Sequence, residues 1–234
     1  MDRLTEQLDR LYAPAGEGQV RTLVLAFARC RDWPAVAAVL QGVADDLELP
    51  APALSISAAE GYQVWFVLTE PVPAAVGGRF LAGLQRRFLV DLPAARLAGL
   101  PATEGLAPLA GLPRVPALDE ASGRWSAFVD PAMGGMFAEA PGLEISPNPE
   151  RQADLLAGLR GITPAELAGA LEKFDALAAA PAQAGGVTGS IAGGPFADPG
   201  DFLRAVMNDA NAPLALRIEA ATALLSARAG KPLG

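Results

Sequence analysis

The feature that most constrains the fold is a pair of β-like segments on either side of Glu60–Gly61. Residues 53–59, ALSISAA, alternate apolar and polar side chains with a period of two. Residues 62–69, YQVWFVLT, are rich in the aromatic and β-branched side chains that strands favour. Because a glycine-containing turn joins the two segments, they predict a β-hairpin.

Alternation along the hairpin also predicts which side chains face the core, since successive residues of a strand point to opposite faces of a sheet. The face that we expect to lie in the core carries Tyr62, Val64 and Phe66. The opposite face, which we expect to be open, carries Ser55, Ser57, Gln63 and Trp65.

Predicted strands and helices alternate on both sides of the hairpin. The apolar residues 22–29 predict a buried strand, in which Leu23, Leu25 and Phe27 face the core. Helices are expected over 34–48, where Asp32 can cap the start, and over 74–90. Residues 124–130, RWSAFVD, predict a further strand. This order predicts an α+β fold with the split βαβ core of ferredoxin-like and RNA-recognition-type (RRM-like) domains, covered by helices on one face.

Changes in composition divide the chain into four predicted parts. Residues 1–135 form an α/β domain that begins with a short amphipathic helix, and residues 136–178 form a helical extension. Residues 179–197, rich in Gly and Ala, predict a flexible linker, and residues 198–234 predict a hairpin of helices that forms the tail.

The side chains available exclude several kinds of site. The chain has no histidine and one cysteine, Cys30, which removes Ser–His–Asp and Cys–His nucleophile systems, His-based zinc sites and Cys₄ clusters. We expect neither a metal site nor a cofactor. A net charge of −8 disfavours nucleic acid as a partner, so a protein partner is the first expectation. The chain shows no secretory signal and no apolar span, so we expect no membrane partner and a cytoplasmic location.

Residues 55–73, SISAAEGYQVWFVLTEPVP, carry a resemblance to a known family. The G-Y-x-V-W-F strand and the E-P-V-P helix start, preceded by an apolar strand and a Trp-Pro helix start, resemble the archaeo-eukaryotic primase (primase–polymerase) superfamily. The resemblance covers residues 23–88 and extends loosely to Asp130.

The resemblance implies metal-dependent nucleotidyl transfer, for which the family uses two aspartates on alternate residues of its first strand. Ala26 and Ala28 stand at those positions here, and Gln63 stands where the family has a nucleotide-contacting histidine. Asp130 is the one candidate for the family's third acid. We therefore expect a non-catalytic, primase-like binding or assembly module. Its expected contact surface consists of Arg29, Ser55, Ser57, Gln63, Trp65 and Arg124.

Two alternatives stay open. A divergent metal-dependent nucleotidyltransferase would use Asp130 with Asp45 or Asp46 in relocated roles. A DNA-packaging adaptor would depend on the tail, because residues 201–225, DFLRAVMNDANAPLALRIEAATALL, resemble a segment of phage terminase small-subunit-like proteins. The tail resemblance implies a phage or mobile-element origin and a homo-oligomer formed through the tail.

Overall fold

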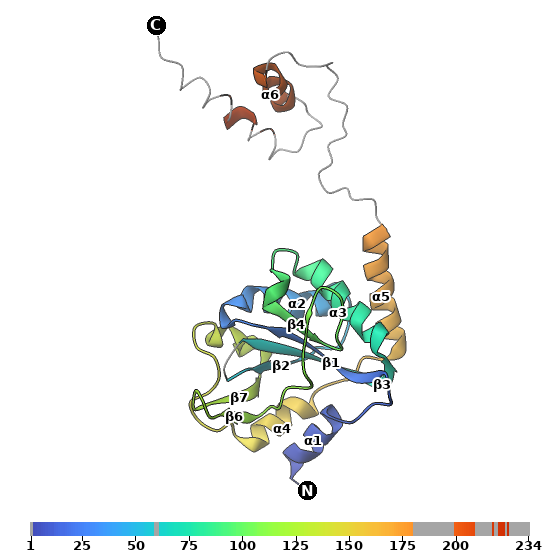
Figure 1. Cartoon of the computed structure of the whole chain (residues 1–234), viewed down its shortest axis with the longest axis vertical. Coiled ribbons are helices and arrows are strands. Elements are labelled where there is room, and N and C mark those ends of the chain that lie inside the picture. Colours follow the sequence, from blue (N-terminus) through green and yellow to red (C-terminus); the bar gives the residue numbers. More distant parts are fainter. Residues whose placement is uncertain are drawn as a thin grey trace. The chain divides into compact units, whose positions relative to one another are not determined.

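The computed structural model describes residues 2–58, 61–179 and 199–208, together with positions 217, 220–222 and 224. The chain divides into two compact units, Met1–Ala179 and Ala180–Gly234, and each is described by itself. In the first unit, one sheet of seven strands carries helices on both faces (Figure 1). The predicted α+β class is therefore confirmed.

The strands follow the order β5-β4-β1-β3-β2-β7-β6 across the sheet. All neighbours are antiparallel except β4 and β5, which are parallel. The strands are β1 (Gln19–Phe27), β2 (Ala53–Ile56), β3 (Tyr62–Pro73), β4 (Leu97–Leu100), β5 (Ala107–Pro108), β6 (Ala117–Asp119) and β7 (Arg124–Val129). The helices of this unit are α1 (Arg3–Leu11), α2 (Trp33–Asp45), α3 (Ala74–Phe88), α4 (Pro149–Ala157) and α5 (Pro164–Ala179), with the 3₁₀ segments η1 (Cys30–Asp32), η2 (Ala94–Arg96) and η3 (Pro131–Phe137).

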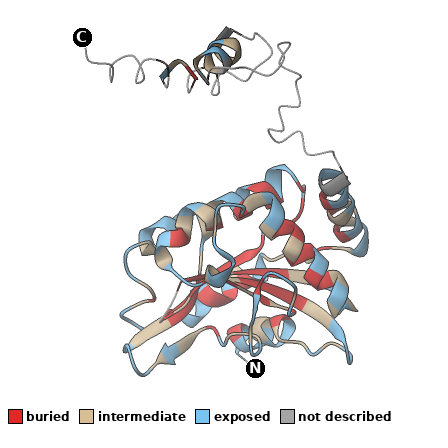
Figure 2. Ribbon diagram, turned by 45° about the horizontal axis from the view of Figure 1, so that its top comes forward, coloured by how far each residue is buried: buried red, intermediate tan, exposed pale blue. Residues whose placement is uncertain are grey.

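One face of the sheet packs against α2, α3 and α5 and forms the larger core. Figure 2 shows the buried residues concentrated along the strands and on the sides of the helices that face them. The residues of β1 and β3 that alternation directs to the core are all buried there: Leu23, Leu25, Phe27, Tyr62, Val64 and Phe66. The predicted hairpin of β2 and β3 and the predicted inward face are confirmed.

The opposite face of the sheet is largely covered by α1 and α4, although the sequence predicts an open face there. Leu11 of α1 and Leu156 of α4 belong to a second core that also contains Trp65. Trp65 and Ser55 are both 0% exposed, so the prediction that they line an open face is wrong. The covering helices come from the N-terminal segment and from the predicted extension, and strand periodicity carries no information about where such distant segments dock.

The strands that extend the sheet beyond β1 and β2 also differ from the expectation. The strand that pairs with β1 on the side away from β3 is β4, which lies in a Pro- and Gly-rich stretch that shows no periodicity in the sequence. The predicted strand at 124–130 does form, as β7, but it pairs with β2 at the other side of the hairpin. β4 has the sequence Leu-Ala-Gly-Leu, in which two small residues stand between two leucines, so apolar and polar side chains do not alternate along it.

The second unit is described over α6 (Pro199–Asn208) and at five further helical positions. The predicted linker lies almost entirely outside the described residues, and so does most of the second predicted helix of the tail. Across the described parts of both units, no helix combines the length and the apolar composition needed to cross a bilayer.

Candidate functional site

The face that α1 and α4 cover becomes accessible toward the end of β1. Val24 is fully buried, Ala26 is half-buried and Ala28 is exposed. Ala26 is paired with Gln63 of β3 and with Ala98 of β4, both of which are half-buried. These residues form a strip across the three strands, which we call the alanine strip: Ala26, Ala28, Gln63 and Ala98. The two positions that the resemblance matches to metal-binding aspartates therefore lie at the accessible end of the sheet.

A chain of two hydrogen bonds, which starts at a buried side chain, fixes the side chain of Gln63. The indole Nε1 of Trp65 donates to Ser55 Oγ at 2.8 Å, and Ser55 Oγ donates to Gln63 Oε1 at 2.7 Å. Trp65 is held in turn by an edge contact with Tyr12 and a tilted ring contact with Phe128, whose ring centroids lie 6.1 and 5.5 Å away. Ser55 and Trp65 are thus supports of the alanine strip and not contact residues themselves. The carboxamide nitrogen of Gln63 forms no hydrogen bond within the described part of the chain and can donate to a bound partner.

Arg29 and Ser57 lie at the same end of the sheet. Arg29 is exposed directly after β1, and Ser57 is half-buried directly after β2. Gly61 brings them together, because its backbone accepts a hydrogen bond from Ser57 N and passes so close to Arg29 that a Cβ at position 61 would lie 2.7 Å from Arg29 N. The structure therefore brings Arg29, Ser57 and Gln63 to one end of the sheet.

Arg124 is the sixth predicted contact residue, and most of its guanidinium contacts other residues of the fold. Its Nη2 donates to Gly142 O at 3.2 Å, and its Nη1 lies 4.0 Å from Glu144 Oε1. Its side chain is 28% exposed, so it presents only part of the guanidinium to a partner.

An ion pair beside the alanine strip was not anticipated from the sequence. Asp32 is 3% exposed, makes no capping hydrogen bond with its side chain and pairs instead with Arg96. Ala28 N donates to Arg96 O at 2.9 Å, which places the pair next to the exposed end of β1. The expectation that Asp32 caps the helix with its side chain is wrong, because Arg96 binds its carboxylate. No sequence signal joins Asp32 to Arg96, which belongs to a stretch without periodicity.

Two further reactive groups lie close by, and burial raises the pKa of both from ordinary values that already lie above neutral pH. Burial raises the pKa of Tyr62 to about 12, and the neighbouring Cys30 adds to the shift. The hydroxyl of Tyr62 donates to Gly134 O at 2.8 Å. Burial also raises the pKa of the Cys30 thiol, which Arg124 opposes in part. Neither side chain is prepared as a nucleophile, since the deprotonated form is the reactive one.

Asp130 lies away from the acids with which a relocated metal site would have to combine. It is exposed and its Oδ1 accepts a hydrogen bond from Ala132 N at 2.9 Å, which caps η3. η3 packs against Trp33, the first residue of α2, whereas Asp45 is the last residue of the same helix. Thirteen helical residues span about 20 Å. Asp46, beyond that end, is paired with Arg87 at 2.9 Å.

The relocated site of Asp130 with Asp45 or Asp46 is therefore not assembled. Asp130 instead lines a cavity of about 560 Å³ between β7, η3 and α4. Among the described residues, no group of three or more Cys, Asp or Glu side chains is close enough to hold a metal ion.

No family model matches this chain, and no curated protein matches it.

Proposed function

We propose that the chain is a non-catalytic, primase-like module that binds a protein partner through the alanine strip. The observation that carries the proposal is the position of Ala26 and Ala28. Ala26 lies near the accessible end of the central strand β1, paired with Gln63, and Ala28 follows directly after that strand. The family resemblance places two metal-binding aspartates at these two positions.

The strand order supports the scaffold half of the proposal. β4-β1-β3-β2 is antiparallel throughout, and α2 and α3 connect β1 to β2 and β3 to β4. That order is expected of a split βαβ, ferredoxin-like core, to which β5, β6 and β7 are added at the edges. Proteins that share this topology carry out many different functions, so the function of this chain depends on the chemistry of the alanine strip.

The chemistry of the alanine strip supports a loss of nucleotidyl transfer. Mg²⁺ and Mn²⁺ bind to carboxylate and carbonyl oxygens, and an alanine side chain supplies none. Asp32, a carboxylate beside the strip, is paired with Arg96. An arginine there competes with a cation for the same oxygens.

The same strip is suited to contact with a protein. Its methyl groups allow the backbone of a partner to approach the sheet closely, Gln63 offers a hydrogen-bond donor, and Arg29 offers an exposed charge at the edge. The net charge of −8 works against a polyanionic partner.

Position-specific photo-crosslinking in the host cells tests whether the alanine strip binds a protein partner. A photoreactive residue at position 28 should give a discrete crosslinked partner, and the Gln63→Arg variant should abolish it. The matched control is position 44, an exposed alanine on α2 over the other face of the sheet, which should not give that product. An identical crosslink from both positions would contradict the proposed surface.

Primer extension with the purified full chain tests whether the chain lacks nucleotidyl transfer. With Mn²⁺, labelled primer–template and nucleoside triphosphates, we expect no incorporation above the protein-free background. Incorporation that requires Mn²⁺ and is lost in Asp130→Asn would overturn the non-catalytic proposal in favour of a divergent nucleotidyltransferase. Metal-independent, salt-sensitive retention of the DNA would replace the protein partner by a nucleic acid.

A further inference from the structure

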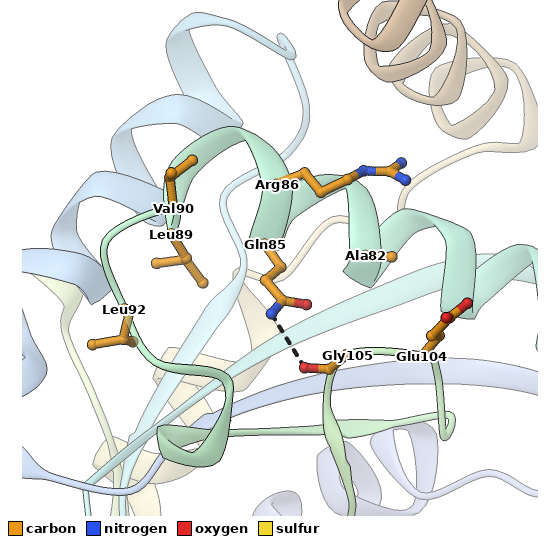
Figure 3. Close-up of a pocket in the computed structure, with 8 residues that line it drawn as sticks. All are labelled: Ala82, Gln85, Arg86, Leu89, Val90, Leu92, Glu104 and Gly105. Atoms are coloured by element: carbon orange, nitrogen blue, oxygen red, sulfur yellow. Dashed lines mark hydrogen bonds between the residues drawn. The ribbon is translucent and has the colours of Figure 1, made fainter.

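A cavity of about 660 Å³ lies on the outer side of α3, away from the alanine strip. Its walls are the second half of α3, the residues that follow that helix and the loop that contains Gly105 (Figure 3). This volume falls in the range of about 300–1,000 Å³ that is usual for sites that bind small molecules.

The side chain of Gln85 divides the cavity and holds its two walls together. Its Nε2 donates to Gly105 O at 3.2 Å, so α3 is tied to the opposite loop across the middle of the cavity. Gly105 has a φ of +82°, a conformation that favours glycine, and a Cβ there would lie 3.1 Å from Gln85 Oε1. The loop is therefore built to accept this contact.

The two ends of the cavity differ in chemistry. Figure 3 shows Leu89, Val90 and Leu92 on one side of Gln85, and Arg86 and Glu104 on the other. Val90 is 76% exposed, which leaves a large apolar side chain uncovered at the first end. The second end carries one positive and one negative side chain.

Arg86 and Glu104 are both exposed, and among the three arginines of α3 Arg86 is the one without an ion-pair partner in the described part of the chain. The other two arginines of α3 are paired: Arg79 with Asp175 of α5, and Arg87 with Asp46, each at 2.9 Å. Within the described residues, Arg86 and Glu104 form no ion pair, either with each other or with a third group. A ligand with both charges could satisfy both side chains at once.

We propose that this cavity binds a small zwitterion with an apolar side chain, of the class of leucine, phenylalanine and their dipeptides. The ligand carboxylate lies against the guanidinium of Arg86, which can hold it with two parallel hydrogen bonds. The ligand ammonium group lies against Glu104, and the apolar side chain covers Leu89, Val90 and Leu92. Such a ligand matches the apolar end and both unpaired charges.

The probes are L-leucine, L-phenylalanine and the dipeptide Leu-Leu, titrated into the ¹⁵N-labelled full chain and followed by NMR. We expect saturable shifts of the amide signals at 82–92 and 104–105. N-acetyl-leucine lacks the ammonium group, leucinamide lacks the carboxylate and glycine lacks the apolar side chain. Each should bind at least about tenfold more weakly, since each loses one of the three contacts.

Two charge-removing variants complete the test. Arg86→Gln and Glu104→Gln should each weaken binding by about tenfold or more, whereas Arg87→Gln, the matched control on the next residue, should change it by less than about twofold. Circular dichroism would show that all three variants fold. The absence of saturable binding up to about 10 mM of every probe, or binding that is indifferent to both Arg86→Gln and Glu104→Gln, would overturn the proposal.

Discussion

At the scale of a single residue, Gln152 of α4 completes the backbone hydrogen bonding of strand β7. Phe128 N of β7 donates to Gln152 Oε1 at 2.8 Å, and Gln152 Nε2 donates to Phe128 O at 2.9 Å. β6 ends its pairing with β7 at Ser126, so the side-chain amide takes the place of the next residue of that strand. Gln152 is 4% exposed, and water cannot replace it.

Gln152→Leu should therefore lower the free energy of unfolding by about 2–5 kcal/mol, because it leaves one buried donor and one buried acceptor without partners. Urea denaturation measures the change. The control is Gln41→Leu on the exposed side of α2, which should stay within about 0.5 kcal/mol of the parent chain. Equal effects of the two substitutions would contradict the role assigned to Gln152.

Tyr62 gives a pH-dependent prediction at the same scale. Burial raises its pKa from 10.0 to about 12, so the folded chain holds the phenol proton more tightly than the unfolded chain does. Its contribution to stability is full below pH 10 and is lost as the pH rises through 12. Tyr62→Phe should cost about 1–3 kcal/mol near neutral pH, because Gly134 O loses its donor.

The stability difference between the parent chain and Tyr62→Phe should then shrink as the pH is raised from about 10 to about 12. Denaturation with urea at a series of pH values measures both chains side by side, so that other groups that titrate in this range cancel. A difference that stays constant across the range would mean that Tyr62 titrates alike in the folded and unfolded chains.

At the scale of elements, the contact between α3 and α5 depends on one glycine. A Cβ at Gly83 would lie 2.1 Å from Cδ2 of Phe174, a side chain that is 4% exposed in the larger core. Gly83→Ala should destabilise the chain by about 1–3 kcal/mol by pushing α5 away. Gly169→Ala in α5 is the matched control, since nothing lies within 4 Å of its Cβ position. There, the better helix propensity of alanine should stabilise the chain by about 0.5–1 kcal/mol.

Because Gly83→Ala should destabilise the chain and Gly169→Ala should stabilise it, thermal or urea denaturation separates the two effects clearly. If Gly83→Ala were also stabilising, α5 would not pack on α3 as closely as the structure has it.

The elements also explain how far the sequence could be interpreted. Alternation in β1 and β3 predicted the buried face, because side-chain direction in a strand is fixed locally. It could not predict that α1 and α4 cover Trp65, since that depends on residues far away in the chain. Alternation could predict that Ala26 and Gln63 share a face, because both lie on strands with clear periods, and Ala28 follows directly after β1. The ion pair of Asp32 with Arg96 could not, because it joins a short 3₁₀ segment to a stretch without periodicity.

At the scale of the whole molecule, the first unit contains two cores of its own. Among the described residues, every buried residue of these two cores lies between Leu4 and Phe174. A chain that ends at Ala179 should therefore fold on its own, because it keeps the sheet and all five helices that cover it.

Truncation after Ala179 separates folding from assembly. The shortened chain should unfold within about 2 °C of the first transition of the full chain, since it keeps every described buried residue of both cores. If the tail forms a homo-oligomer, as its resemblance implies, light scattering should report an oligomer for the full chain and a monomer for residues 1–179. An oligomer of unchanged size after truncation would place the contact between copies on the first unit and would remove the argument for a packaging adaptor. A truncated chain that does not fold would contradict the division into two units.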